Sequence, residues 1–345
     1  MYLACVAMTA WSQNLVLEQE EADDAIAVVG YFCKNDTMTY RQVYNKYKIQ
    51  ENDTTVSESY VEEFMIVVTD STSDGFKMKC IPLSFTLQDT DTDTDDIMTN
   101  AMSQLTQSVV CEFTTDEMGQ LKSITNWREI RDQLKKNVKV TCDTLYATIS
   151  DLDSIMPRKS LENLLLLGFS TEEGIRDSYE ELESLFGLHG SAFDLGEKEV
   201  DPEEQGYPQH ISAKAGYTII ENEEDDFEGD YAISTRTTTT IPVEDLMDLG
   251  FGTLSLMLSD VLTDSLDAVR GQIADSLKIA KPNGAEVIVN EYYGFFLNGW
   301  PKEYYYEKKI DLGISQNIET NYIEWISRNW NIYTVDDENE STTHI

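Results

Sequence analysis

The segment EYYGFFLNGWPKEYYYEKK, residues Glu291–Lys309, decides the fold class of this chain. Eight of its nineteen residues are aromatic, and the dipeptide Asn298-Gly299 lies near its centre. Asn and Gly both adopt positive φ with little strain, so this dipeptide is a strong short-range signal for a tight β-turn. The flanking residues, Ala285–Leu297 and Lys302–Leu312, are strand-like in composition. We therefore predict an antiparallel hairpin here.

Two uses of these aromatic side chains fit the pattern. Alternation places Tyr293 and Phe295 on one strand face and Tyr292 and Phe296 on the other. Cross-strand aromatic pairs stabilise a hairpin by about 0.2–1 kcal/mol each, so packing alone is a sufficient reason for them. The sharper hypothesis is a platform that stacks on a sugar or lines an apolar groove. Its candidate ligand-binding residues are Tyr292, Phe296, Trp300 and Tyr305.

The whole chain is predicted to be α+β, with antiparallel β-sheet packed against long amphipathic helices. Strand-like segments cluster at Val61–Thr69 and Phe76–Leu87, and helical periodicity separates the clusters. The longest helical region begins near Pro242. Such clustering favours antiparallel sheet over a doubly wound parallel sheet. Residues 13–335 are expected to form one α+β domain, or two sheet-plus-helix halves with a hinge near 196–206.

The charge balance limits the classes of partner. The chain has 64 acidic and 25 basic residues, a formal net charge of −39. A field of this sign repels phosphate backbones, so no nucleic-acid partner is predicted. The longest apolar run, Asn163–Phe169, is too short to cross a bilayer, so no membrane span is predicted. A strong acidic excess is typical both of salt-adapted organisms and of cation-rich surroundings, and composition does not separate the two.

The N-terminal residues indicate export. Residues 1–12 are similar to the remnant of a secretory signal peptide, with an apolar stretch at Leu3–Ala10 and small residues before a cleavage position at Gln13. A basic leader is missing from this stretch, and an ordinary buried strand is the alternative. The polar tail 336–345 is predicted to be disordered. Export predicts a periplasmic or extracellular location in the cell envelope.

Neither the cysteines nor the aspartates predict a metal site. The chain has five cysteines, and four remain if the signal-peptide remnant is removed. An even number permits disulfides in an exported chain, but no pair has the CxxC spacing of zinc or thioredoxin-type sites. Disulfides and small buried thiols both stay open for Cys33, Cys80, Cys111 and Cys142. The alternate aspartates that begin at Asp89 suggest a calcium loop. Thr94 stands where that loop needs glycine, and Asn100 where it needs a bidentate glutamate, so the register fails.

Catalytic signatures are scarce. The chain has only three histidines and lacks a nucleophile elbow, a P-loop and a dinucleotide fingerprint, so no cofactor is predicted. A glycosidase needs only two neighbouring carboxylates, and 64 acids cannot be screened by spacing alone. The acids nearest to apolar strand ends are Glu286, Glu291 and Glu324, each expected to be an outward-facing or edge residue.

Two segments carry a resemblance: FTTDEMGQLKSITNWREIRDQLKK (Phe113–Lys136) and GFFLNGWPKEYYYEKKI (Gly294–Ile310). In the first, Asn126 and Glu129 have the spacing of a helix capping box. Together the segments resemble uncharacterised exported, periplasmic or lipoprotein-like proteins of Gram-negative bacteria. That resemblance implies an envelope address and no activity.

The resulting expectation is an exported, non-enzymatic envelope protein. It would bind an apolar small molecule, a glycan or a protein partner between sheet and helices. The alternatives are a carboxylate-dependent glycan hydrolase and a purely structural envelope component. Two close acids in an open cleft lined by Trp or Tyr would favour the hydrolase.

Overall fold

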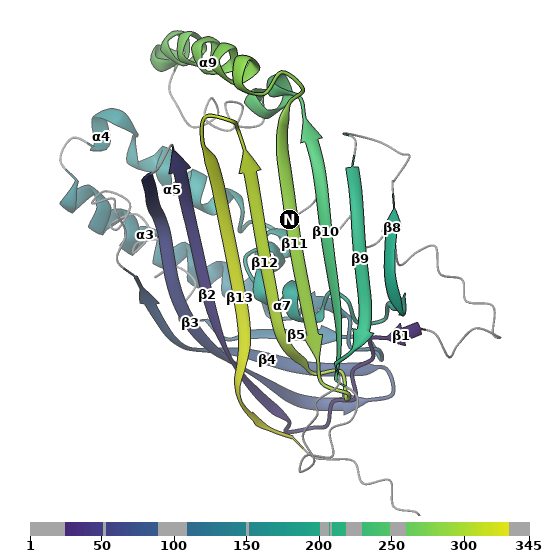
Figure 1. Ribbon diagram of the computed structural model, residues 1–345. Helices are drawn as coiled ribbons and strands as arrows, with labels where there is room; N and C mark the ends of the chain where they lie inside the picture. The colour runs from purple at the N-terminus through teal and green to yellow at the C-terminus, as the bar shows by residue number, and fades with distance from the viewer. Residues whose placement is uncertain are drawn as a thin grey trace, which may run out of the picture.

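The fold is dominated by one antiparallel sheet. The computed structural model describes residues 25–50, 53–88, 109–149, 152–200, 207, 209–218, 230–248 and 260–330. Eleven strands form the sheet, in the order β6-β5-β4-β3-β2-β13-β12-β11-β10-β9-β8 (Figure 1). Strands β1 and β7 form a separate antiparallel pair. The predicted preference for antiparallel over parallel sheet is confirmed.

The sheet is built from two meanders, β2–β6 and β8–β13, which are joined where β13 pairs with β2. The strands are β1 Ala25–Ala27, β2 Thr37–Gln50, β3 Asp53–Thr72, β4 Gly75–Leu87, β5 Cys111–Thr115, β6 Leu121–Ile124, β7 Ala192–Asp194, β8 Gly196–Val200, β9 Gln209–Tyr217, β10 Tyr231–Ile241, β11 Ala285–Phe295, β12 Pro301–Asp311 and β13 Gln316–Asn329. The helices are α3 Trp127–Thr148, α4 Leu152–Ile155, α5 Arg158–Leu167, α6 Glu172–Asp177, α7 Glu180–Phe186 and α9 Asp260–Ala280.

The sheet curls around α7. This helix contacts β12 and also β6, although five strands separate these two in the sheet. A flat sheet cannot bring both strands to one seven-residue helix, so the strands between them must bend around it. Figure 1 shows α7 behind β11 and β12, with β5 passing on its far side. We call the face that encloses α7 the inner face and the opposite one the outer face.

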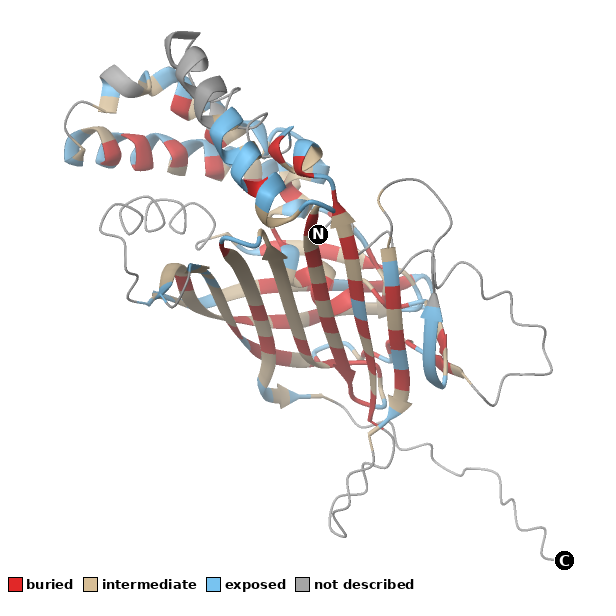
Figure 2. Ribbon diagram, turned by 45° about the horizontal axis from the view of Figure 1, so that its top comes forward, coloured by how far each residue is buried: buried red, intermediate tan, exposed pale blue. Residues whose placement is uncertain are grey.

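Strand alternation assigns side chains to these two faces (Figure 2). One cross-strand row is buried in the same core cluster as α7 and therefore belongs to the inner face: Tyr293, Tyr304 and Ile323. The neighbouring residues along the same strands form a half-buried row on the outer face: Tyr292, Tyr305 and Tyr322.

The centre of the core is aromatic. Trp300 is fully buried, and its ring centroid lies 4.6 Å from that of Phe32 and 6.4 Å from that of Phe186 on α7. Phe186 in turn packs at 5.7 Å against Phe113 on β5. These contacts connect the two meanders of the curled sheet through a single helix. Full burial of large side chains of this kind contributes roughly 1.5–3 kcal/mol each to folding.

The predicted hairpin turn at Asn298-Gly299 is confirmed between β11 and β12. Gly299 has φ +77°, and the amide of Phe296 donates to the carbonyl of Trp300 at 2.9 Å. A Cβ atom at Gly299 would lie 2.0 Å from the carbonyl oxygen of Val29, so glycine is required for close approach as well as for φ. The turn folds back onto the segment before β2, and this contact buries Trp300.

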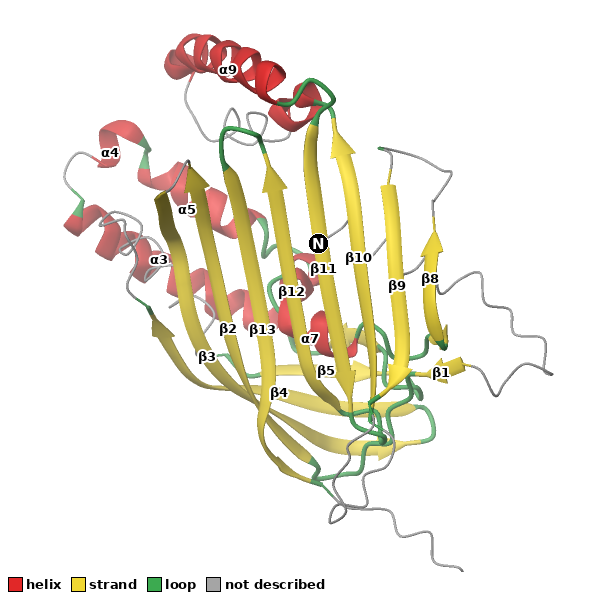
Figure 3. Cartoon of the chain, in the orientation of Figure 1, coloured by secondary structure: helices red, strands yellow, loops and turns green. Residues whose placement is uncertain are grey.

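The prediction of long amphipathic helices packed on the sheet is not borne out (Figure 3). The long helix expected from near Pro242 is described as α9, Asp260–Ala280, in which Leu277 is buried while Ile273 and Ile279 are exposed. Helix α3 buries one face, mainly against α5, α6 and β5, and α4–α7 are short. An apolar period predicts a helix but does not specify the surface that it covers.

The start of α3 differs from the predicted capping box. Asn126 is the N-cap residue, but its side chain makes no cap hydrogen bond. Its Oδ1 accepts from the amide of Glu112 at 2.9 Å, and its Nδ2 donates to the carbonyl of Val110 at 2.9 Å. The unpaired backbone groups of β5 compete successfully for this side chain, so Asn126 joins α3 to the sheet.

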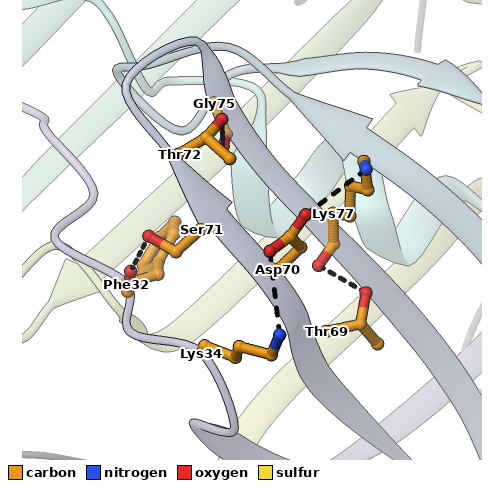
Figure 4. Close-up of polar contacts among 8 residues, drawn as sticks. All are labelled: Phe32, Lys34, Thr69, Asp70, Ser71, Thr72, Gly75 and Lys77. Atoms are coloured by element: carbon orange, nitrogen blue, oxygen red, sulfur yellow. Dashed lines mark hydrogen bonds and ion pairs between the residues drawn. The ribbon is translucent and has the colours of Figure 1, made fainter.

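Polar contacts tie the tip of the β3–β4 hairpin to the segment before β2 (Figure 4). The hydroxyl of Ser71 donates to the carbonyl of Phe32 at 3.0 Å. The Asp70 carboxylate lies 3.3 Å from Nζ of Lys77 and 3.9 Å from Nζ of Lys34. These ion pairs are exposed and contribute at most about 1 kcal/mol each. The Ser71 bond is the one that holds Phe32 over the core.

Several sequence predictions concern residues outside the described ranges: the signal-peptide remnant 1–12, the tail 336–345 and the alternate aspartates from Asp89 onward. The predicted hinge near 196–206 is described only in its first part. There, Gly196–Val200 forms the edge strand β8, which pairs with β9.

His189 is a neutral core residue. Its side chain is fully buried, and Nε2 lies 2.8 Å from the carbonyl oxygen of Gly299. A carbonyl can only accept, so Nε2 carries the proton and Nδ1 does not. Nδ1 has no hydrogen-bond partner among the described residues. Burial lowers the pKa of His189 to about 4.

We expect His189 to make the fold less stable in acid. The unfolded chain binds this proton near pH 6.5 and the folded chain only near 4. The stabilising contribution is therefore complete above 6.5 and is lost as pH falls toward 4. An NMR titration should show one histidine ring with a midpoint near 4, and His189→Gln should abolish that signal. Ordinary midpoints for all three histidines would contradict a buried neutral ring.

Candidate functional site

The structure separates the four ligand-binding residues predicted from the sequence. Tyr292 and Tyr305 lie directly opposite each other on the outer face, both half-buried. Trp300 is in the core, and Phe296 is 5% exposed beneath Trp325 and Trp330. The four side chains therefore do not share one surface.

The inner face carries an aromatic ladder formed by Tyr44, Tyr60 and Phe85. Tyr44 on β2 and Tyr60 on β3 are direct cross-strand partners, with ring centroids 4.9 Å apart and planes 17° apart. Phe85 on β4 stacks on Tyr60 at 5.2 Å and 26°. All three rings are half-buried, unlike the aromatic side chains around α7. The ladder is a continuous apolar surface that the described part of the chain leaves partly accessible.

Two amide side chains beside the ladder have unsatisfied oxygens. Gln42 is 4% exposed and lies two residues before Tyr44 on the same strand face; Asn321 is 8% exposed and lies directly opposite Tyr44. Among the described residues, neither Oε1 of Gln42 nor Oδ1 of Asn321 has a hydrogen-bond partner. An unpaired buried polar atom costs roughly 1–3 kcal/mol, so two of them side by side call for a partner.

A pair of carboxylates completes this part of the inner face. Glu62 lies directly opposite Gln42 on one side and Phe85 on the other. Loss of solvent raises the pKa of Glu62 to about 7. Burial and then the negative charge of Glu62 raise the pKa of Glu181, on α7, well above its usual range. The two groups therefore interact, and near neutral pH they favour holding a proton between them.

Of the acids singled out from the sequence, Glu291 is not outward-facing. It is 7% exposed on the inner face, where Tyr293 donates to its Oε1 at 3.0 Å and Thr235 to its Oε2 at 3.4 Å. Burial raises the pKa of Glu291. Glu286 and Glu324 are half-buried residues of the outer face. Tyr306 and Asn321 separate Glu291 from the Glu62 pair along the sheet.

No metal centre is assembled by the part of the chain that the structure describes, where no group of three or more His, Cys, Asp or Glu side chains is placed to hold an ion. Cys33, Cys80, Cys111 and Cys142 are free thiols. Cys80 and Cys111 lie directly opposite each other on β4 and β5, and burial raises the pKa of both. Raised thiol pKa values make these cysteines poor nucleophiles.

The comparisons with known proteins were made on both sequence and fold. No family model and no curated protein sequence matches the chain. A lipovitellin structure matches over 88% of this chain with 9% identity and a TM-score of 0.36; the chain spans only 26% of that protein. A Bacteroides fragilis protein with a YmcC-like fold matches over 88% of this chain and 100% of its own, with 8% identity and a TM-score of 0.15.

A loop-deletion mutant of the outer membrane protein OmpT of Vibrio cholerae matches over 84% of this chain and 99% of its own, with 7% identity and a TM-score of 0.17. At these scores the site must be judged on its own residues. Within the described ranges, no helix has both the length and the apolar character that membrane crossing requires.

Truncation of Trp300 should destabilise the fold much more than truncation of Tyr305. Trp300→Ala removes a fully buried ring and should lower the free energy of unfolding by about 3–5 kcal/mol. Tyr305→Ala removes half of an outer-face pair and should lower it by at most about 1 kcal/mol. Urea denaturation followed by tryptophan fluorescence and circular dichroism measures both. Equal losses would contradict the assignment of Trp300 to the core.

Proposed function

We propose that this chain is an exported, non-enzymatic envelope protein that binds an amphipathic small molecule on the inner face of its curled sheet. The observation that carries the proposal is the aromatic ladder, half-buried and flanked by buried amide oxygens that lack partners. Binding sites for small molecules combine an apolar wall with a few convergent polar groups, and this combination is found here. The location in the envelope rests on the N-terminal sequence and on the resemblance stated above.

Burial along β2 supports this choice of face. From the core outward, its inner-face residues are Met38 and Tyr40, both fully buried, then Gln42 at 4% exposure, then half-buried Tyr44. Beyond them Lys46 is exposed. The dry core therefore ends at Gln42 and Tyr44. A ligand at this boundary would bury its apolar part on the ladder without displacing core side chains.

Loss of a ladder ring should weaken binding of an uncharged apolar probe. Tyr60→Ala should reduce the affinity for N-phenyl-1-naphthylamine about fivefold, since an aromatic contact contributes about 1 kcal/mol. The matched control is Tyr305→Ala, the same change on the outer face, which should leave the affinity unchanged. Fluorescence titration measures both. An unchanged affinity of Tyr60→Ala for the probe, or no probe binding by the wild-type chain, would exclude a ligand on this face.

Glycan hydrolysis is the second candidate, and one observation favours it. Glu62 and Glu181 are interacting carboxylates beside two tyrosines, and a carboxyl with a pKa near 7 suits a general acid. If this reading holds, Glu62→Gln and Glu181→Gln should each lower reducing-end release from envelope polysaccharides by at least about 100-fold. If both variants keep the wild-type rate of polysaccharide hydrolysis, or if the wild type has no such activity, hydrolysis is excluded and binding is left as the function.

A further inference from the structure

The uncompensated carboxylates identify the charge of the ligand. We propose that the polar end of the bound amphiphile is an ammonium group, held by Glu62 and Glu181 beside the rings of the aromatic ladder. The inference rests on the proposed binding function and adds a chemical class to it. It is carried by the arrangement of charges on the inner face, by a buried acceptor that lacks a donor, and by the ring faces next to both.

Charges farther out along the same strands of the inner face lie opposite charges of the other sign. One cross-strand row alternates in sign, because each member lies directly opposite a group of the other charge: Lys308, Glu319, Lys46 and Glu58. Four residue positions closer to the core, beyond the row of Tyr44 and Tyr60, the row that contains Glu62 holds Gln42 and Ile323 in place of lysines. No Lys or Arg of the described residues forms a salt bridge with Glu62 or Glu181. The cation that matches these two carboxylates is missing from the described part of the chain.

Gln42 gives an independent indication of a ligand. It is 4% exposed, its Oε1 has no donor among the described residues, and it lies directly across from Glu62 on the same face. This acceptor and the Glu62 carboxylate thus belong to cross-strand partners, and the charge of Glu62 also acts on Glu181. A protonated amine offers N–H donors to such acceptors, whereas a quaternary ammonium offers only charge.

The ladder supplies the rest of an ammonium site. Cations are attracted to the faces of aromatic rings by about 0.5–2 kcal/mol, and more strongly where water is excluded. Tyr60 lies between the Glu62 position and the alternating charge row, so an ammonium at Glu62 has its alkyl substituents next to the Tyr60 and Phe85 rings. Among the described residues, the charged neighbours of Glu181 are the carboxylates of Glu62 and Glu180, so this surface should repel an anionic head group.

The groups around the pair determine how binding depends on pH. Glu62 and Glu181 are faced by Tyr60 of β3, Cys80 of β4, Cys111 of β5, and Tyr179 and Glu180 at the start of α7. None of these is a cation. A bound ammonium therefore displaces the shared proton, and affinity for the ammonium should rise as pH increases through neutrality. Affinity for an uncharged amphiphile should not change.

The test compares two probes with the same alkyl chain, dodecylammonium and dodecyl maltoside, below their micelle concentrations. Binding is measured by calorimetric titration of the full chain at physiological ionic strength. Salt at this concentration screens interactions between exposed charges beyond about 8 Å. We expect the ammonium to bind at least about tenfold more tightly than the maltoside at a pH of about 8, and the preference to shrink at a pH of about 5. Glu62→Gln and Glu181→Gln should each remove most of the preference and leave maltoside binding unchanged.

The matched control is Glu63→Gln, the same change one residue along β3, where the carboxylate pairs with Arg41 on the outer face. It should keep the preference. An equal loss in Glu63→Gln would show general attraction to an acidic chain and overturn the site. Equal binding of both probes by the wild type would overturn the ammonium and leave the proposed function intact, whereas binding of neither probe would overturn both.

Discussion

The enclosure of α7 by a single sheet is the constraint on which the rest of this structure depends. Phe186 has to be covered by β5 of the first meander and by the β11–β12 turn of the second. The eleven strands can meet that requirement only by curling. The curl gives the inner face a centre from which water is excluded, whereas the outer face has no such centre. Trp300 closes the centre because the turn that carries it folds back onto Val29 and Phe32.

The candidate site is a consequence of where this enclosure stops. Helix α7 buries Leu182, Leu185 and Phe186, whereas Glu180 at its start is exposed and Glu181 half-buried. The inner face opposite that first turn cannot be covered by α7. Strands β2 and β3 continue past it and place Tyr44 and Tyr60 there. The same strands thus build the core at one end and the ladder at the other.

Local patterns were sufficient to predict the hairpin and the antiparallel class, because a turn dipeptide and strand alternation act over a few residues. They could not find the candidate site. Alternation along a strand puts Tyr40, Gln42 and Tyr44 on one face, but the pairing of Tyr44 with Tyr60 depends on the β2–β3 register, which shifts at a bulge between Lys46 and Tyr47. Glu181 reaches Glu62 only through the curl, which no local signal encodes. Trp300 was predicted as a ligand-binding residue from the aromatic pattern alone, whereas the turn that carries it is buried by its contact with Val29.

Scarcity of basic residues makes the uncompensated pair more informative. The chain has 25 Lys and Arg for 64 acids, so most acids must be solvated rather than paired. On the inner face, away from the core, Lys46 and Lys308 nevertheless lie directly opposite acidic residues of the neighbouring strands. A desolvated carboxylate without a counter-ion is destabilising by several kcal/mol, and protonation relieves only part of this. A substitution to glutamine at position 62 would remove that penalty and pair readily with Gln42. Among the described residues, no lysine or arginine forms a salt bridge with Glu62 or Glu181, and a positively charged ligand would explain why charge is retained there.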